Sequence, residues 1–447
     1  MIFACSVFCI CDVVAVVVGN IFTNIYFTFF SSFDVFYNII TKLEAIITYS
    51  LTATISKLVI IPMENFWIYI PIIIIIVWMG VVWILKRMYA QPYRPIEPQV
   101  PYCDLTMSII TTVYNENPKI FKAALCSWQA NEPEEIIAVI DKTDRNCVQA
   151  FMEFSKDKPW AKLIVTSKPG KREALSDGVL QSKSEIVALV DSDTIWGYNI
   201  KQKLLAPFRI PEIGAVTMRI QALGRECIWQ KLSDIFWDIR NFSALPSQTA
   251  MGKTLNVLSG NASLYRREIV ISKLNEFLNE NILGRKKESG DDYCLTRIIH
   301  RDGWKTYYQH NAEGYTSAPM NFKTFLKQRI RWYRNVHNSN IASLMDKRTW
   351  KQRYVAFYAI DYLMMTFAIF SGPILVVTAI YMGYWSIVLF VVIVSILNMT
   401  IKAIPHLKRQ PNDIFILHIY VVITFVMELT WIYALITVKK QRWIRNR

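Results

Sequence analysis

Long apolar segments near both ends of the chain restrict its fold more than any other feature of the sequence. A stretch of about 20 apolar residues is long enough to cross the hydrocarbon core of a bilayer as a helix. Such stretches lie on either side of a polar central region, at 66–85, 355–382, 384–401 and 414–437. A further span is predicted within residues 3–30, where Asp12 is the only charge. We therefore expect an integral, multi-pass membrane protein.

Basic residues beside these segments predict the orientation of the chain. Lys86 and Arg87 directly follow the segment 66–85 and are expected in the cytosol, because short cytosolic flanks are enriched in basic residues. The same rule places the tail 439–447 inside. Three crossings after a cytosolic domain would leave this tail outside. We therefore expect either one re-entrant or interfacial C-terminal segment, or a break in 355–382 near Gly372-Pro373.

Composition excludes several classes of protein. With 53% hydrophobic and 19% charged residues, the chain is too apolar for an ordinary soluble enzyme and too charged for a protein that lies wholly in the membrane. The net charge of +15 suits anionic lipid headgroups or anionic substrates. Nucleic acid is not an expected partner, because no binding motif accompanies the charge. The eight cysteines show no ligand-like spacing, so neither a zinc site nor a disulfide framework is expected.

The central region predicts an α/β fold. Buried-strand patterns alternate with helical patterns at 119–130 and 172–181, and the strands are expected at 105–113, 135–140, 163–165 and 186–190. Such alternation is typical of a parallel sheet with helical crossovers. Four prolines in 90–101 suggest a linker before this domain, and 226–242 has the pattern of an amphipathic helix.

Two carboxylates directly follow the most apolar of these strands. Ile186–Val190 is uninterrupted, and Asp191 and Asp193 come next with one small residue between them. Ligands of open α/β sheets bind beyond the carboxyl ends of the strands. Carboxylates in that position can hold a hard divalent cation that serves substrate phosphates. The alternative is an ordinary Asp-Ser turn.

Other polar residues are expected at the same edge. Asn115-Glu116 and Asp141 follow two further strands, and Lys171 follows a strand and a glycine. Lys171 can reach a diphosphate as a point charge, and Asp141 can accept a hydrogen bond from a nucleotide base or ribose. The alternatives are a solvated lysine and a strand-end turn residue.

Two motifs farther along the chain complete the candidate site. Asp291 and Asp292 form a second acidic pair, one of which can act as a general base, or simply stabilise a helix N-terminus. Gln328 and Arg331 suit a pyrophosphate, and the indole of Trp332 suits stacking on a sugar ring. For Trp332 the alternative is a membrane-interface anchor.

Taken in order, these motifs resemble one family. The set comprises Tyr114-Asn-Glu116, Asp141, Gly170-Lys-Arg-Glu173, Asp191-Ser-Asp193, Ser259-Gly260, Gly290-Asp-Asp292 and Gln328-x-x-Arg331-Trp332. It resembles the membrane-integrated processive glycosyltransferases of family 2, the cellulose, chitin and hyaluronan synthase superfamily, over roughly residues 105–335. Val190–Thr194 and Leu326–Trp332 are most similar to hyaluronan synthases. Asn261 and Tyr293 depart from those enzymes, which usually carry Pro and Arg there.

The resemblance implies a domain organisation. A cytosolic domain of the Rossmann-like GT-A type would occupy 102–335, carried by N- and C-terminal transmembrane helices. The flanking parts would be an N-terminal membrane region with two spans (1–88), interfacial amphipathic helices (336–354), a transmembrane channel region (355–438) and a basic cytosolic tail (439–447).

The resemblance also implies a role for each motif. Asp141 would contact uracil, with Glu116 in the nucleotide pocket, and Lys171 would hold the UDP diphosphate. Asp191 and Asp193 would bind nucleotide and Mn²⁺ or Mg²⁺, with Asp193 the more direct ligand. Asp292, beside Asp291, would deprotonate the acceptor hydroxyl. Pyrophosphate and acceptor sugar would be bound by Gln328, Arg331 and Trp332.

The expected reaction is an inverting, metal-dependent transfer from UDP-sugars to a growing polysaccharide that leaves through the membrane, which is expected to be the plasma membrane. The favoured product is hyaluronan, made from UDP-GlcNAc and UDP-GlcA. A chitin-like or cellulose-like homopolymer is the alternative within the class. A non-catalytic scaffold or a transporter is the alternative outside it, although no motif acid is missing and few ionisable residues lie in the spans.

Overall fold

The computed structural model describes residues 66–100 and 104–440. The predicted span in 3–30 and most of the basic tail lie outside these residues. The chain divides into two compact units, of which the larger comprises 75–370 and 398–447 and contains the whole central region.

An eight-stranded mixed sheet forms the core of the larger unit, in the order β3-β2-β1-β4-β7-β6-β10-β5. Strands β3, β2, β1 and β4 are all parallel, as predicted, whereas β7 runs antiparallel to both β4 and β6. The strand bounds are β1 (Met107–Val113), β2 (Glu135–Asp141), β3 (Ala161–Thr166), β4 (Ile186–Asp191), β5 (Ile195–Trp196), β6 (Ile213–Leu223), β7 (Ala262–Arg266) and β10 (Lys305–Ser317). A separate hairpin pairs β8 (Asn281–Ile282) with β9 (Arg285–Lys286).

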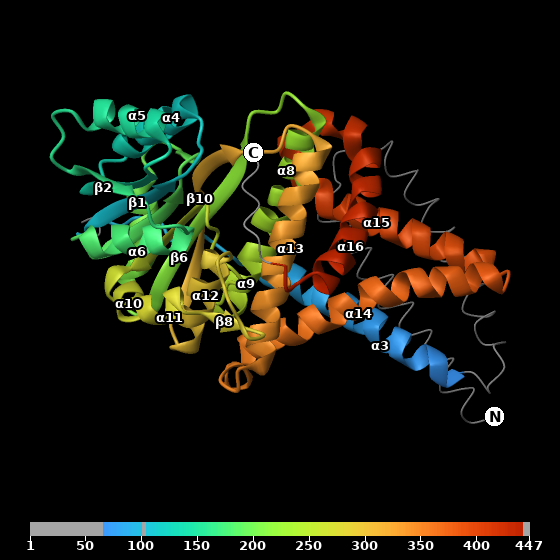
Figure 1. Ribbon diagram of the computed structural model, residues 1–447. Coiled ribbons are helices and arrows are strands. Elements are labelled where there is room, and N and C mark those ends of the chain that lie inside the picture. The colour runs from blue at the N-terminus through green and yellow to red at the C-terminus, as the bar shows by residue number, and fades with distance from the viewer. Residues whose placement is uncertain (1–65, 101–103, 441–447) are drawn as a thin grey trace. The chain divides into compact units, whose positions relative to one another are not determined.

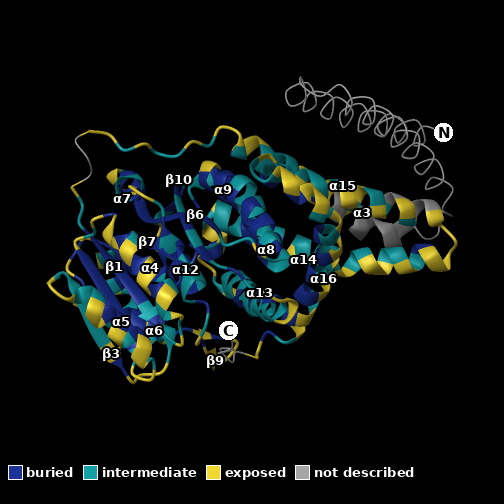
Figure 2. Ribbon diagram, turned by 90° about the horizontal axis from the view of Figure 1, so that it is seen from above, coloured by how far each residue is buried: buried dark blue, intermediate teal, exposed yellow. Residues whose placement is uncertain are grey.

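Helices cover both faces of the sheet (Figure 1). Helices α4 (Pro118–Gln129) and α5 (Arg145–Ser155) lie on one face, and α6 (Lys171–Gln181) lies on the other. Because successive side chains of a strand point to opposite faces, Ile109 packs in the same core as Phe121, and Ile110 in the same core as Leu175. The inner strands are therefore buried on both sides, as their uninterrupted apolar runs predicted (Figure 2).

The remaining short helices lie between the strands or after the last of them, and one of them carries the acidic pair. They are α7 (Lys201–Leu205), η2 (Ala206–Arg209), α8 (Ile228–Ile239), η3 (Arg240–Ala244), α9 (Leu245–Gly252), α10 (Arg267–Ser272), α11 (Leu274–Leu278), α12 (Asp291–Arg301), η4 (Thr349–Lys351) and η5 (Pro411–Ile416). The predicted helix 226–242 is thus α8, with its last turn continued by a π-helix.

Helix α13 (Phe322–Met345) runs without a break across residue 335, where the sequence placed a domain boundary. Asn321 caps its N-terminus, its Oδ1 accepting a hydrogen bond from the Thr324 backbone N–H at 3.0 Å. No glycine or proline lies within the helix to interrupt it. The candidate acceptor residues and the expected interfacial segment therefore begin on one continuous helix.

Four long helices correspond to apolar segments found in the sequence: α3 (Phe66–Ala90), α14 (Arg353–Tyr381), α15 (Trp385–Arg409) and α16 (Leu417–Ile436). Within the described residues, three stretches are long and apolar enough to cross a membrane, namely Arg353–Tyr381, Val391–Arg409 and Pro411–Ile436. Large apolar side chains on them are exposed, for example Phe367 and Leu429. The break considered near Gly372-Pro373 is absent, because α14 continues through Pro373.

Candidate active site

The polar residues predicted at the sheet edge do meet there. In the parallel ladders, Thr112 of β1 pairs with Asp191 of β4, and Val113 pairs with Ile140 of β2. The carboxyl ends of these three strands therefore lie next to one another, with Asp141 and Asp191 as the last residues of β2 and β4. The edge is continuous with the loop after β1, because Ser192 Oγ donates to Glu116 Oε2 at 2.8 Å.

A small open cavity at this edge brings two predicted motifs together with the acidic pair. It is lined by Lys171, Leu175, Leu189, Val190, Asp191, Ser259, Gly260, Ser263, Tyr265, Asp291, Asp292 and Leu295. Lys171 Nζ lies 2.8 Å from Asp191 Oδ1 and 3.1 Å from Asp291 Oδ2. Burial disfavours its ammonium, but these carboxylates raise the pKa of Lys171 above its usual range. Asp191 and Asp291, which are 100 positions apart, are thus joined through one cation.

Asp291 and Asp292 occupy the first turn of α12, after Gly290 in the left-handed conformation (φ +77°). Their different environments give the two carboxyls different pKa values. Burial and the neighbouring Asp291 raise the pKa of Asp292 from 3.8 to about 6. Burial acts on Asp291 as well, but Lys171 outweighs it and lowers the pKa of Asp291 below its ordinary value. Two adjacent carboxyls with different acidities are a common arrangement for acid–base chemistry.

The Asp-Ser-Asp motif offers the oxygen donors that a hard cation requires. Burial raises the pKa of Asp191, and Asp193 adds to this effect, although Lys171 opposes it. Asp193 is 1% exposed, lies outside the cavity lining and accepts a hydrogen bond from Thr316 Oγ1 at 3.2 Å. The pair fits Mg²⁺ or Mn²⁺, because two neighbouring carboxylates supply oxygen ligands at a strand end.

Asn261 connects the two motifs and replaces the proline of the resembling enzymes. Its Oδ1 accepts from Ser259 Oγ at 3.0 Å, and its Nδ2 donates to Thr316 Oγ1 at 3.1 Å. Thr316 in turn donates to Asp193. The substitution therefore adds hydrogen bonds next to the candidate metal ligands.

Tyr265 is a lining residue that the sequence did not single out. It lies on β7, is 2% exposed, and its pKa is raised by burial and by Asp292 and Asp291. In the sequence, the only indication of this residue was a tyrosine within the short apolar strand Ala262–Arg266. The sequence did not predict that this strand pairs with β4.

The structure places other predicted residues outside the cavity lining. Asp141 accepts from the backbone N–H and the hydroxyl of Thr143, at 2.9 and 2.6 Å, as a strand-end turn residue does. On α13, Trp332 packs against Trp237, Ala222 and Ala318. Gln328 Oε1 is buried and has no hydrogen-bond partner among the residues that the structure describes.

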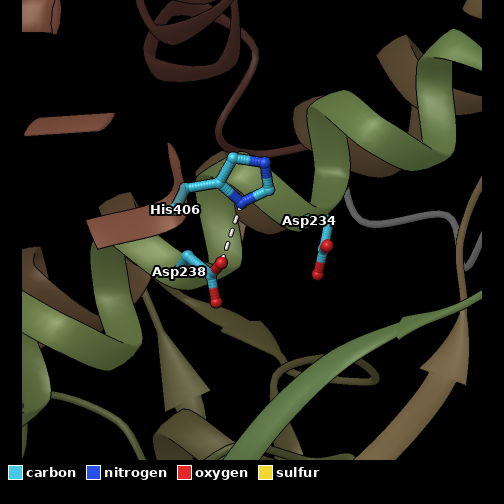
Figure 3. A group of neighbouring side chains, drawn as sticks. All are labelled: Asp234, Asp238 and His406. Carbon is cyan, nitrogen blue, oxygen red and sulfur yellow. Dashed lines mark hydrogen bonds and ion pairs between the residues drawn. The ribbon is translucent and has the colours of Figure 1, made fainter. Parts of the chain in front are cut away.

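A second group of carboxylates, shown in Figure 3, lies outside the cavity lining. Asp234, Asp238 and His406 are all buried, and their ligand atoms are within 4.8 Å of one another. Arg409 donates to both aspartates, and Arg225 pairs with Asp234. His406 Nδ1 and Nε2 lie 2.8 Å from Asp238 and Asp413. Arginines in these positions exclude a cation, so this group is a buried ion-pair network.

A model of glycosyltransferase-like family 2 matches residues 107–335. The chain belongs to this family. It is 26% identical to an N-acetylglucosaminyltransferase of Rhizobium meliloti, over 80% of this chain and 87% of that protein. It is 27% identical to a hyaluronan synthase of Streptococcus pyogenes, over 76% of this chain and 83% of that protein.

A solved structure shows a similar fold. A mannosyltransferase from Pyrobaculum calidifontis, in complex with GDP-Man and Mn²⁺, matches with a TM-score of 0.54 at 15% identity, over 81% of this chain and 95% of its own. The GT-A-like α/β fold predicted from the sequence is thereby confirmed. The protein is a family 2 glycosyltransferase related to hyaluronan synthase and N-acetylglucosaminyltransferase, and its described residues include three helices able to cross a membrane.

Proposed function

We propose that the protein is a processive, inverting glycosyltransferase of the plasma membrane that polymerises UDP-sugars on its cytosolic side and exports the product. The observation that carries this proposal is the cavity where Lys171, Asp191, Asp291 and Asp292 converge at the sheet edge. The favoured polymer is hyaluronan, made from UDP-GlcNAc and UDP-GlcA.

Donor binding uses the strand-end groups. Lys171 is already desolvated and held by two carboxylates, so a diphosphate entering the cavity can take the place of these anions at Nζ. Asp191 and Asp193 would hold Mn²⁺ or Mg²⁺, which supplies charge stabilisation to the leaving diphosphate. Asp141 and Glu116, at the ends of the neighbouring strands, are assigned to the nucleoside.

Proton transfer is assigned to Asp292. Its pKa of about 6 leaves it ionised at neutral pH, yet basic enough to take the proton of an acceptor hydroxyl. Asp291 stays ionised beside Lys171. Its negative charge lies next to the proposed base, Asp292. A single base that activates the acceptor for in-line displacement of UDP gives inversion at the sugar carbon.

Acceptor binding is assigned to α13. Gln328 Oε1 has no hydrogen-bond partner among the described residues, and Trp332 and Arg331 lie one helical turn farther along. Trp332 is held by packing against Trp237, which orients the indole as a platform for a sugar ring.

A chitin-like homopolymer is the second candidate, because one relative is named an N-acetylglucosaminyltransferase. The deciding experiment measures UDP release and polymer from the purified full chain with Mn²⁺, with each UDP-sugar alone and with pairs. Polymer only from UDP-GlcNAc plus UDP-GlcA supports hyaluronan, whereas polymer from UDP-GlcNAc alone supports the homopolymer. No release with any donor contradicts the enzymatic proposal.

A further inference from the structure

Arg172 directly follows Lys171, but its side chain points away from the cavity lining and is buried. It is 2% exposed, and its guanidinium lies 5.2 Å from the centre of the Phe277 ring. Nη1 donates to the Phe277 carbonyl at 2.8 Å. Nη2 lies 2.6 Å from Glu280 Oε2, 3.1 Å from the Ser289 carbonyl and 3.3 Å from the Gly290 carbonyl. One side chain thus contacts the two residues that precede the acidic pair.

Glu280 anchors this arginine to the helix that carries the pair. Its second carboxylate oxygen, Oε1, accepts from Arg297, which lies on α12. Burial opposes ionisation, but the two arginines lower the pKa of Glu280 below its ordinary value. A buried carboxylate shared by two guanidiniums has little freedom to move, because losing either partner leaves a desolvated charge.

The Ser289-Gly290 turn is also held from the opposite side. Ser289 Oγ donates to Asn335 Oδ1 at 3.0 Å. Gly290 has φ +77°, a conformation that favours glycine, and a Cβ there would lie a tight 3.3 Å from Asn335 Cγ. Asn335 is on α13, three residues after Trp332. The turn therefore lies between the helix that carries Lys171 and the helix that carries the candidate acceptor platform.

We propose that Arg172 is a positioning residue: through the Ser289-Gly290 turn it sets Asp291 and Asp292 against Lys171, and Asn335 completes the clamp. This inference rests on the proposed function. The arrangement also brings a fixed positive charge near Asp291, which helps to keep that carboxyl ionised. Lysine cannot replace the arginine here, because an ammonium cannot reach the carboxylate and both carbonyls with a planar fork.

The test compares R172K and R172M with the matched control R266K in the full chain. Arg266 likewise donates to two backbone carbonyls, of Ile213 and Phe208, and lies 5.6 Å from a phenylalanine ring, but it is at the far end of β7. For R172K, kcat should fall by about 10- to 100-fold with the KM for donor changed less than about threefold, because misplaced groups slow chemistry more than binding. For R172M, kcat should fall at least as far, since no hydrogen bond to Glu280 or to the Ser289 and Gly290 carbonyls remains.

Binding of UDP shows which variants are folded. If R172K and R172M bind UDP as the wild type does and keep kcat within about twofold of R266K, the inference is overturned. If they lose UDP binding, N335A decides instead: a reduced kcat with unchanged UDP binding supports the clamp, and an unchanged kcat overturns it. Absence of transfer by the wild type would overturn the proposed function itself.

Discussion

Two groups of carboxylates in this protein differ in charge balance and access. At the sheet edge, Asp191, Asp291 and Asp292 share the single cationic lining residue Lys171 and face an open cavity. In the second group the carboxylates are Asp234, Asp238 and Asp413, with side chains at most 5% exposed, and their partners are Arg225, Arg409 and His406. In the first group one cation faces three carboxylates beside an open cavity, whereas in the second two arginines and a histidine lie among three carboxylates.

The difference separates a candidate site from a structural network. Both ring nitrogens of His406 contact carboxylate oxygens, and each of these carboxylates also contacts an arginine. The network joins α8 to the end of α15 and to η5. Proximity of carboxylates and a histidine therefore does not identify a metal site. Such a site is identified by which side chains pair with the carboxylates and by whether a ligand can reach them.

The largest expected effect tests the open group. Replacement of the base in D292N should lower kcat by about 10³-fold, within the range of general-base contributions, while UDP binding is retained. The matched control is D177N, because Asp177 lies on α6 and pairs with Lys168 at 3.0 Å outside the cavity lining. Polymerisation by D292N at the wild-type rate would show that the base is elsewhere.

The second prediction tests the closed group. In R409M, Asp234 and Asp238 lose a shared partner within a buried network, so the free energy of unfolding should fall by about 3 kcal/mol. For K168M, which breaks an exposed pair, the loss should stay below about 1 kcal/mol. Unfolding in detergent measures both. Equal stabilities of the two variants would mean that the network does not hold α15 to α8.

Metal binding should depend on the carboxylates at the sheet edge and not on those of the ion-pair network. Mn²⁺ at about 100 times its Kd should stabilise the wild type by about 2.7 kcal/mol, seen as a rise in Tm. D193N should lose this rise, and D238N should keep it. A rise that survives in D193N but disappears in D238N would reverse the two assignments.

The smallest expected effect is the pH dependence of stability near Asp292. Its folded pKa is about 6, above the ordinary 3.8, so the folded protein binds the proton more tightly than the unfolded chain. This carboxyl therefore favours folding more at low pH, and its contribution diminishes as pH rises from about 4 to 6. The activity should instead rise over this pH range, because the base must be ionised. The difference in unfolding free energy between D292N and the wild type, measured from pH 4 to pH 7, should grow in favour of the variant. A constant difference would contradict the raised pKa.

Many of the polar residues at the carboxyl edge of the sheet could be predicted, because their positions depend on local sequence patterns. The run Ile186–Val190 predicted a doubly buried strand, and its end placed Asp191 next to the residues after β1 and β2. The role of Arg172 could not be predicted from its motif, because its partner Glu280 is 108 residues away. The second carboxylate group was equally invisible, because Asp238 and His406 are 168 residues apart.

By itself, the sequence determined the apolar helices, the parallel half of the sheet and the acidic and basic groups at its edge, because periodicity and strand ends are properties of neighbouring residues. Only the tertiary structure decided that Lys171 joins Asp191 to Asp291, that Asp292 is the less acidic of its pair, and that Asp234 and Asp238 are neutralised by arginines. Charge balance and burial depend on which distant side chains the fold brings together, and no local pattern specifies that.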